Sequence, residues 1–333
     1  MCSKRKPVTC AWTAAQSRLK ILIIRLFFLY VIFSYSQAVI SGPAQAQSAL
    51  VYDSVVSVLP QWPNPASRAA EPEGSGIVIL DGRTILTARH VINNALSIVV
   101  RTGDGRVLKA EVIGEDILTD LAVLTIKETL NPMSFGRDAE VGERACAIGN
   151  AFGLGLSMTC GVVSAVNKAG VGFNPIEDFV QTDAAVNPGA SGGALVARDG
   201  TLLGILSAIF TKQTDANIGV NFAVSSALAK FVATALAQNG KVNWRFSGLK
   251  LGPAVPRGEV GTLGAMVENI RPGTPAQKAG LKNGDVILQL EKRRIKSPAD
   301  FKSAFVISPP GAKRKLKIIR NKAIMTLEIQ LPE

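Results

Sequence analysis

The sequence predicts a mainly β chain, in which short antiparallel strands form barrels or a sandwich and are followed by a small α+β module. Residues 50–225 consist of short apolar runs separated by glycine-rich turns, which is the spacing typical of such folds. The charge changes after this region, because residues 47–240 hold 13 basic and 18 acidic residues whereas 241–333 hold 18 and 7. With 47% apolar residues in 333, both parts can bury a core, which excludes disorder as the main state.

Residues 1–46 have the pattern of an export signal. They carry six basic and no acidic residues, an apolar stretch at 26–33, and small residues at 44 and 46 that suit cleavage before Gln47. The alternative is a retained membrane anchor at 21–40, because about 20 residues span a bilayer. Both place residues 47–333 outside the cytoplasm.

The order of elements in residues 47–240 follows from turn and cap signals. Residues 76–80 and 84–87 flank an Asp81-Gly82 turn and predict a hairpin. Further strands are expected at 107–113, 121–126, 145–149, 159–166, 202–209 and 219–224. An apolar helix at 227–237, capped by Ser225 or Ser226 and ended by Asn239-Gly240, plausibly closes this part.

Two segments about a hundred residues apart suggest a serine nucleophile and its general base. Ser191 lies in Asn-Pro-Gly-Ala-Ser-Gly-Gly, and His90, the one histidine of the chain, lies in Thr-Ala-Arg-His-Val. A serine hydroxyl needs an imidazole to take its proton and a third group to orient that imidazole, and Asp120 is the candidate. We expect the oxyanion hole on Gly189, Ala190 and Ser191, with the amides of the first and last as donors.

The four cysteines divide by position. Cys2 and Cys10 lie in the leader, whereas Cys146 and Cys160 are equidistant from Gly153 and would oppose one another in a simple hairpin. Opposed residues lie within disulfide range, so these two either form a bridge or remain buried thiols. A metal site is not expected, because one histidine and two cysteines supply too few soft ligands.

Basic residues gather in two clusters of the second module, at 292–296 and 313–317. They form either a solvated surface or a surface for an anionic membrane, an acidic peptide or the acidic first part of the chain. Nucleic acid is not expected, because no aromatic residue interleaves these clusters.

These residues resemble the HtrA/Deg family of trypsin-like serine proteases with PDZ domains. The resemblance covers nearly all of 50–333, through motifs at 74–77, 85–91, 120–124, 149–155, 181–195 and 219–224. It implies a chymotrypsin-like double β-barrel, with His90 as base, Asp120 as its orienter and Ser191 as nucleophile, in the chain order of chymotrypsin. It also implies a periplasmic or envelope endopeptidase of protein quality control or stress signalling, with no cofactor, assembled as a trimer.

Three positions near the nucleophile qualify this resemblance. Ala190 replaces the asparagine usual in the family, which removes a side chain that could brace the loop and opens the alternative of a catalytically silent chaperone or peptide sensor. Ala185, six residues before the serine, provides no carboxylate for Lys or Arg, so an aliphatic residue is expected before the scissile bond. Asp183, the rival carboxylate, is interpreted as structural.

Residues from about 247 onward resemble one PDZ domain. A strand at 264–267, a helix after Thr274-Pro275 ended by Gly280, a strand at 284–288 and a second helix from Ser297 are expected. The second helix and the strand at Gly248, Leu249, Lys250 and Leu251 would form a groove for unfolded or C-terminally exposed polypeptides, which add as an extra strand. The alternative is a small module that only holds the chain together.

Overall fold

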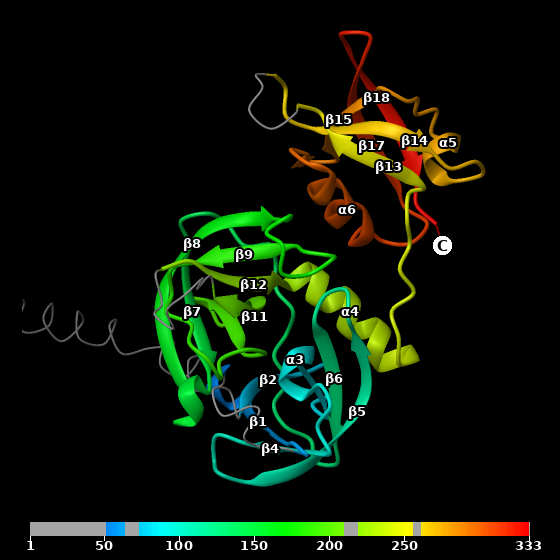
Figure 1. Cartoon of the computed structure of the whole chain (residues 1–333). Helices are drawn as coiled ribbons and strands as arrows, with labels where there is room; N and C mark the ends of the chain where they lie inside the picture. Colours follow the sequence, from blue (N-terminus) through cyan, green and yellow to red (C-terminus); the bar gives the residue numbers. More distant parts are fainter. Residues whose placement is uncertain (1–50, 64–72, 210–218, 256–260, 333) are drawn as a thin grey trace, which may run out of the picture. The chain divides into compact units, whose positions relative to one another are not determined.

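The computed structural model describes residues 51–63, 73–209, 219–255 and 261–332. Its first six strands close into a barrel in the order β1-β2-β3-β6-β5-β4, drawn in blue to teal in Figure 1. Closure leaves no free sheet edge. The strands are β1 (Val55–Gln61), β2 (Gly74–Ile79), β3 (Thr84–Ala88), β4 (Ser97–Arg101), β5 (Val107–Asp116) and β6 (Leu121–Ile126).

A second six-stranded barrel follows in the order β10-β11-β12-β9-β8-β7. The chymotrypsin-like double barrel that the resemblance implies is therefore confirmed, and the sandwich that the strand pattern also allowed is not formed. The strands are β7 (Arg144–Gly149), β8 (Ser157–Lys168), β9 (Phe179–Thr182), β10 (Ala194–Ala197), β11 (Leu202–Ile209) and β12 (Asn221–Ser225). Two short helical turns matter for the site: α3 (Arg89–Ile92) and η2 (Ala151–Gly153).

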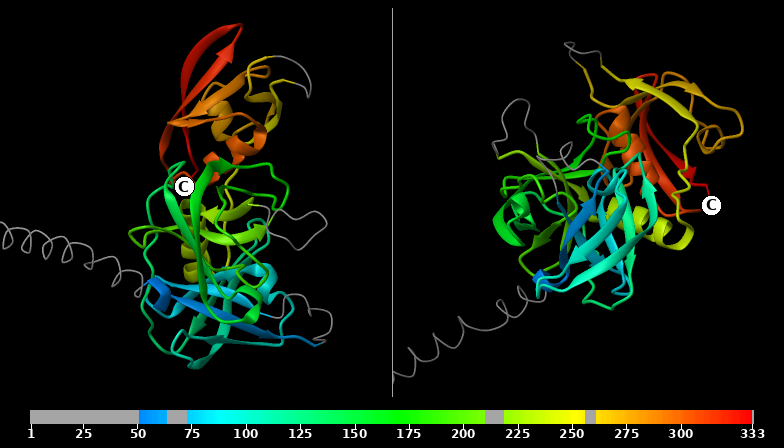
Figure 2. Two further views of the ribbon diagram at one scale, coloured as in Figure 1. Left: turned by 90° about the vertical axis from the view of Figure 1, so that its left-hand side faces the viewer. Right: turned by 60° about the horizontal axis from the view of Figure 1, so that its bottom comes forward.

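A shared apolar cluster joins the two barrels, and each barrel also has a buried cluster of its own. Ile77 and Leu86 of the first barrel and Ile148 and Ile205 of the second belong to the same buried cluster, and all four side chains are 0% exposed. Figure 2 shows the strands of both barrels from two further sides.

Helix α4 (Ser226–Asn239) follows the second barrel and contributes to the same core through Leu228, Val232 and Leu236. Its N-cap is Ser225, whose hydroxyl accepts the Leu228 N–H, and Gly240 ends it in the left-handed conformation with φ 68°. The helix predicted at 227–237 is confirmed and is slightly longer at both ends.

Residues 249–330 form the α+β module, with sheet order β13-β14-β15-β17-β18 and β16 paired to β15. Helix α6 packs Phe301 and Phe305 into a core with Val267, Ile287 and Leu316. The elements are β13 (Leu249–Pro253), β14 (Ala265–Ile270), α5 (Pro275–Lys278), β15 (Val286–Leu290), β16 (Arg293–Arg294), α6 (Pro298–Val306), β17 (Lys313–Arg320) and β18 (Ala323–Gln330).

The export signal or anchor expected at 1–46 lies outside the described residues. Among the helices that the structure does describe, none combines the length and the apolar character needed to cross a bilayer.

Candidate active site

His90 and Asp120 meet at the rim of the first barrel. His90 lies in helix α3, directly after β3, and Asp120 lies in the turn between β5 and β6 with φ 58°. One carboxylate oxygen, Oδ2, lies 2.5 Å from Nδ1 of the imidazole, while Oδ1 accepts the backbone N–H of His90 at 2.9 Å. The carbonyl of Asp120 also accepts the N–H of Arg89 at 2.8 Å. Three contacts thus fix the ring and its orienting carboxylate together.

Ser191 lies on the loop that enters β10 of the second barrel, and this loop contacts the first barrel. Its carbonyl accepts the N–H of Ser75 in β2 at 2.9 Å. A Cβ added to Gly192 would lie 2.9 Å from the backbone nitrogen of Ala88, so the loop passes close to the start of α3. The Ser191 hydroxyl donates to the carbonyl of Ser207 in β11 at 3.4 Å.

Two peptide planes beside Ser191 are oriented to leave their N–H groups available. The carbonyl of Pro188 accepts the N–H of Phe152 at 2.7 Å, and the carbonyl of Ala190 accepts the N–H of Gly193 at 2.9 Å. Because N–H and C=O point in opposite directions across a trans peptide, the N–H groups of Gly189 and Ser191 point away from these partners. Neither donates to an acceptor within the described parts of the chain.

Ala190 lies between the two expected donors, and its own N–H is bonded within the loop. Its N–H donates to the carbonyl of Asn187 at 3.0 Å and so closes a tight turn. Its side chain is 5% exposed and packs against Gly149, where an added Cβ would lie 3.1 Å away. The alanine therefore fills space under the loop, and its amide shapes the turn.

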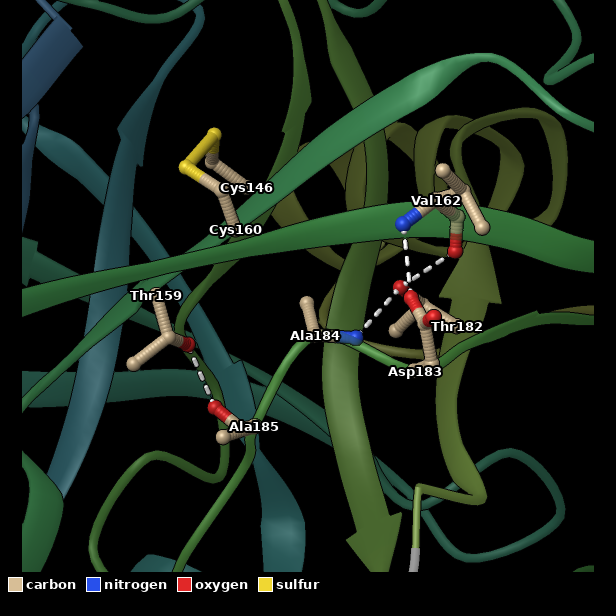
Figure 3. The surroundings of a disulfide bond; sticks show 8 residues. All are labelled: Cys146, Thr159, Cys160, Val162, Thr182, Asp183, Ala184 and Ala185. Atoms are coloured by element: carbon tan, nitrogen blue, oxygen red, sulfur yellow. Dashed lines mark hydrogen bonds between the residues drawn. A yellow bond between two sulfur atoms is a disulfide. The ribbon is translucent and has the colours of Figure 1, made fainter.

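The segment before the nucleophile is held by strand β8 (Figure 3). The hydroxyl of Thr159 donates to the carbonyl of Ala185 at 2.5 Å. The carboxylate of Asp183 accepts the N–H of Val162 at 2.6 Å, and a Cβ on Gly161 would lie 2.1 Å from the same oxygen. Asp183 thus bonds to β8, as its structural interpretation requires, and Ala185 adds no charge to this segment.

A disulfide joins Cys146 and Cys160 on the same strand pair (Figure 3). The two residues are direct cross-strand partners of β7 and β8, with Cα atoms 4.0 Å apart. The bridge lies on β8 between Thr159 and Gly161, the two residues that contact Ala185 and Asp183. It therefore braces the strand that supports the segment before the nucleophile.

The α+β module has a groove of about 320 Å³ beside β13. Leu249 and Leu251 line it, whereas Lys250 points to the other face and pairs with Glu268 at 3.1 Å. Gly248 lies in the preceding turn with φ 82°. The other lining residues are Arg245, Phe246, Ser247, Pro298, Phe301, Lys302, Phe305 and Val306.

Three successive backbone N–H groups directly precede β13 at this groove. Strand β13 is at the edge of its sheet and is bonded only to β14 among the described strands. In the part of the chain that the structure describes, the N–H groups of Phe246, Ser247 and Gly248 donate to no acceptor. Successive N–H groups of this kind form an anion-binding concavity.

Comparisons with known proteins agree with this architecture. The model of the trypsin-like peptidase domain matches residues 74–205, and that of the PDZ domain matches 216–331. A solved structure described as "HtrA-type protease AlgW with tripeptide" is 32% identical with a TM-score of 0.67, covering 87% of this chain and 97% of that one. The chain belongs to the HtrA family.

Curated relatives of this HtrA chain include two enzymes of enteric bacteria. It is 35% identical over 283 residues to the "Periplasmic pH-dependent serine endoprotease DegQ" of Escherichia coli K12, covering 81% of this chain and 61% of that protein. It is also 35% identical to the "Periplasmic serine endoprotease DegP" of Salmonella typhimurium LT2, covering 78% of this chain and 57% of that protein. The chain thus spans about three fifths of the length of these relatives.

Sequence reasoning missed three contributors to the site of this HtrA chain. Phe152 acts through its backbone N–H, Ser207 through its carbonyl, and Ser75 through both its backbone and its hydroxyl. Backbone groups leave no mark in a sequence. Ser75 does lie in the Gly-Ser-Gly motif at 74–76, but the motif does not reveal the partner of its hydroxyl.

Proposed function

We propose that this chain is a serine endopeptidase that cleaves unfolded or exposed polypeptides in protein quality control or stress signalling. Ser191 Oγ attacks the scissile carbonyl while His90 takes its proton and Asp120 holds the imidazolium. The oxyanion binds the N–H groups of Gly189 and Ser191. The intermediate then expels the amine, which receives the proton from His90. Water, deprotonated by the same histidine, hydrolyses the acyl-enzyme.

The orientation of the two donor peptides is the observation that carries this proposal. A silent chaperone would be favoured if Ala190 left the nucleophile loop without support. Instead, the carbonyls of Pro188 and Ala190 are both hydrogen-bonded on the side away from the hole. No side chain at position 190 is needed for this arrangement, so the protease is preferred over the chaperone.

The test is cleavage of unfolded casein by the mature chain and by Ser191→Ala. Removing the nucleophile of a triad costs about 10⁶ in kcat, so the variant should show no cleavage above background. Ser97→Ala, which removes an exposed hydroxyl bonded to Gln61 on the first barrel, is the matched control and should keep full activity. Equal cleavage by the chain and Ser191→Ala would overturn the proposal.

We propose an aliphatic preference for the residue before the scissile bond. Ala185 offers no charge, and the nearby carboxylate of Asp183 is bonded to the backbone of β8. Cleavage of a peptide library should therefore give Val, Leu, Ile or Ala before the cut. Cleavage mainly after Lys or Arg would contradict this assignment.

The PDZ domain is proposed to bind the C-termini of apolar peptides, either to recruit substrate or to control the protease. Leu251 lines the groove and its neighbour Lys250 does not. Leu251→Ala should lower the affinity for a fluorescent peptide with a free C-terminus by about tenfold or more, whereas Lys250→Ala should leave that affinity unchanged. Equal binding of the free and the amidated peptide would refute carboxylate recognition.

The proposed location is the periplasm or cell envelope, in line with the periplasmic relatives. N-terminal sequencing of the exported protein distinguishes the two leaders: Gln47 as first residue shows cleavage, and an intact N-terminus shows an anchor. A homotrimer is proposed from the family resemblance, and light scattering of the mature chain tests it directly.

An anionic membrane is proposed as a partner of the basic clusters. Lys313, Lys315 and Lys317 are exposed and alternate along β17, so they share one face of the hairpin with β18. Ile324, which is 62% exposed, lies near the end of that hairpin. Sedimentation with vesicles containing phosphatidylglycerol should exceed that with neutral vesicles, and substitution of the three lysines by glutamine should abolish the difference.

A further inference from the structure

Ser75 is a buried hydroxyl that lies between the two barrels. It belongs to β2 of the first barrel and is 0% exposed. Its Oγ donates to the carbonyl of Gly189 at 2.8 Å and accepts the N–H of Asn150 at 2.8 Å, and both of these partners belong to the second barrel. Its backbone N–H donates to the carbonyl of Ser191 at 2.9 Å. The carbonyl of Ser75 in turn accepts the hydroxyl of Thr87 at 2.7 Å.

These contacts complete a set that fixes every carbonyl from 188 to 191. The N–H of Phe152 donates to the carbonyl at 188, and the N–H of Gly193 donates to the carbonyl at 190. The Oγ of Ser75 donates to the carbonyl at 189, and its N–H donates to the carbonyl at 191. Ser75 therefore supplies two of the four partners. A peptide plane whose carbonyl is bonded cannot rotate without breaking that bond, so the N–H groups between these carbonyls share the constraint.

The hydroxyl also reaches the remaining donor peptide indirectly. It accepts the N–H of Asn150, which begins the turn that presents the N–H of Phe152 to Pro188. The Asn150 side chain, in a residue that is 0% exposed, closes the same turn by accepting the N–H of Gly155 at 2.8 Å. Loss of the Ser75 Oγ would leave the buried carbonyl of Gly189 and the buried N–H of Asn150 without this partner.

We propose that Ser75 is a positioning residue that aligns the oxyanion hole from the opposite barrel. The inference rests on the proposed proteolysis and explains how the loop is braced although position 190 carries an alanine. Ser75 touches no substrate atom; it acts through Gly189 and the turn at Asn150. The oxyanion forms only in the tetrahedral intermediate, so its effect belongs to kcat rather than to KM.

The test compares Ser75→Ala with Ser226→Ala in the mature chain. Ser226 is a fair match because it is 2% exposed and its hydroxyl also accepts a backbone N–H, that of Gly136 at 3.0 Å. Each variant is measured for Tm, for kcat and KM on an aliphatic peptide substrate, and for affinity to a peptidyl trifluoromethyl ketone. That inhibitor forms a tetrahedral adduct with the nucleophile and places a negative oxygen in the hole.

For Ser75→Ala we expect kcat to fall about 10- to 100-fold, less than the 10²–10³ for loss of a donor itself, with KM within about twofold. Affinity for the ketone should fall by the same factor. Ser226→Ala should lose thermal stability and keep both values. Ser75→Cys carries a thiol, which is a weaker donor and acceptor than a hydroxyl. Its kcat and its affinity for the ketone should lie between those of Ser75→Ala and the parent, and it replaces the alanine variant in the test if that variant does not fold.

The outcomes separate this inference from the proposed function. If the parent shows no hydrolysis that depends on Ser191, the proteolysis fails and the role of Ser75 fails with it. If the parent is active but Ser75→Ala and Ser75→Cys match Ser226→Ala in kcat and ketone affinity, only the role of Ser75 is refuted. A rise in KM with unchanged kcat would likewise refute it, because it would indicate a damaged substrate site.

Discussion

Replacing Asp120 by asparagine should stop His90 from acting as a base while leaving its position unchanged. The backbone N–H of His90 donates to Oδ1 at 2.9 Å, and Nδ1 faces Oδ2 at 2.5 Å. A backbone N–H can only donate, so the amide oxygen of the asparagine must take the first site and its NH₂ must face Nδ1. Nδ1 then accepts, the ring proton moves to Nε2, and Nε2 can no longer take the proton of Ser191.

The same exchange in other Ser-His-Asp enzymes lowers kcat by about 10⁴. This factor corresponds to about 5.4 kcal/mol in activation free energy. Discontinuous cleavage assays on an aliphatic peptide substrate measure kcat, and Tm is recorded for each variant. We expect Asp120→Asn to lose this factor and to melt within a few degrees of the parent.

Asp116→Asn is the matched control for this prediction. Asp116 lies at the end of β5, is 7% exposed, and accepts from Thr119 and from the indole of Trp244. Its amide variant presents a donor to these donors, so stability should fall while kcat stays within about threefold at temperatures where the protein is folded. If Asp120→Asn kept more than about a tenth of the parent kcat, the tautomer argument would be wrong.

Three further predictions address the support of the site. Substitution of both Cys146 and Cys160 by serine removes a bridge between residues 14 apart in the sequence. The free energy of unfolding should fall by roughly 3 kcal/mol, and Tm should no longer depend on reductant. A Tm equal to that of the parent would contradict this. Gly189→Ala should abolish peptide cleavage, because at φ 90° its Cβ would lie 2.4 Å from the Asn150 carbonyl oxygen. Gly105→Ala is the control: its φ is 89° but the space around it is open, so it should lose stability and keep activity. An active Gly189→Ala enzyme would refute the argument that this close contact shapes the loop. A side-chain hydrogen bond from Arg137 holds the pKa of the Glu143 carboxyl below its ordinary value of 4.5. The ionised carboxylate therefore adds to the free energy of unfolding above pH 4.5, and this contribution is lost as the pH falls through the lowered pKa of the folded state. The urea midpoint should therefore drop less between pH 5 and pH 3 in Glu143→Gln than in the parent, and parallel curves would exclude this contribution.

The sequence predicted the barrels, and it named the candidate site segments, from signals that are local. Turn residues such as Asp81-Gly82 and the cap-forming serines mark where elements begin and end without reference to the rest of the fold. It could not choose between Ser225 and Ser226 as the cap. In the structure Ser225 bonds the Leu228 N–H, while the Ser226 hydroxyl bonds Gly136, ninety residues away. Only the tertiary fold decides between two adjacent serines.

Two other features escaped prediction for physical reasons. Residues 313–317 are predicted only as a basic cluster, and the structure shows in addition that Lys315 and Lys317 alternate with the buried Leu316 and Ile318, which is the period of a half-buried strand. The direction of the Ala190 amide is the second such feature. Successive amides of a tight turn point in different directions, and its own is taken by Asn187.

The proposed base and its orienting acid lie on the first barrel, whereas the proposed nucleophile lies on the second. Catalytic turnover thus reports how well the halves are docked. Mild denaturant that parts them should extinguish turnover while each half keeps its hydrogen-bonded ladder, so loss of activity would precede loss of circular dichroism.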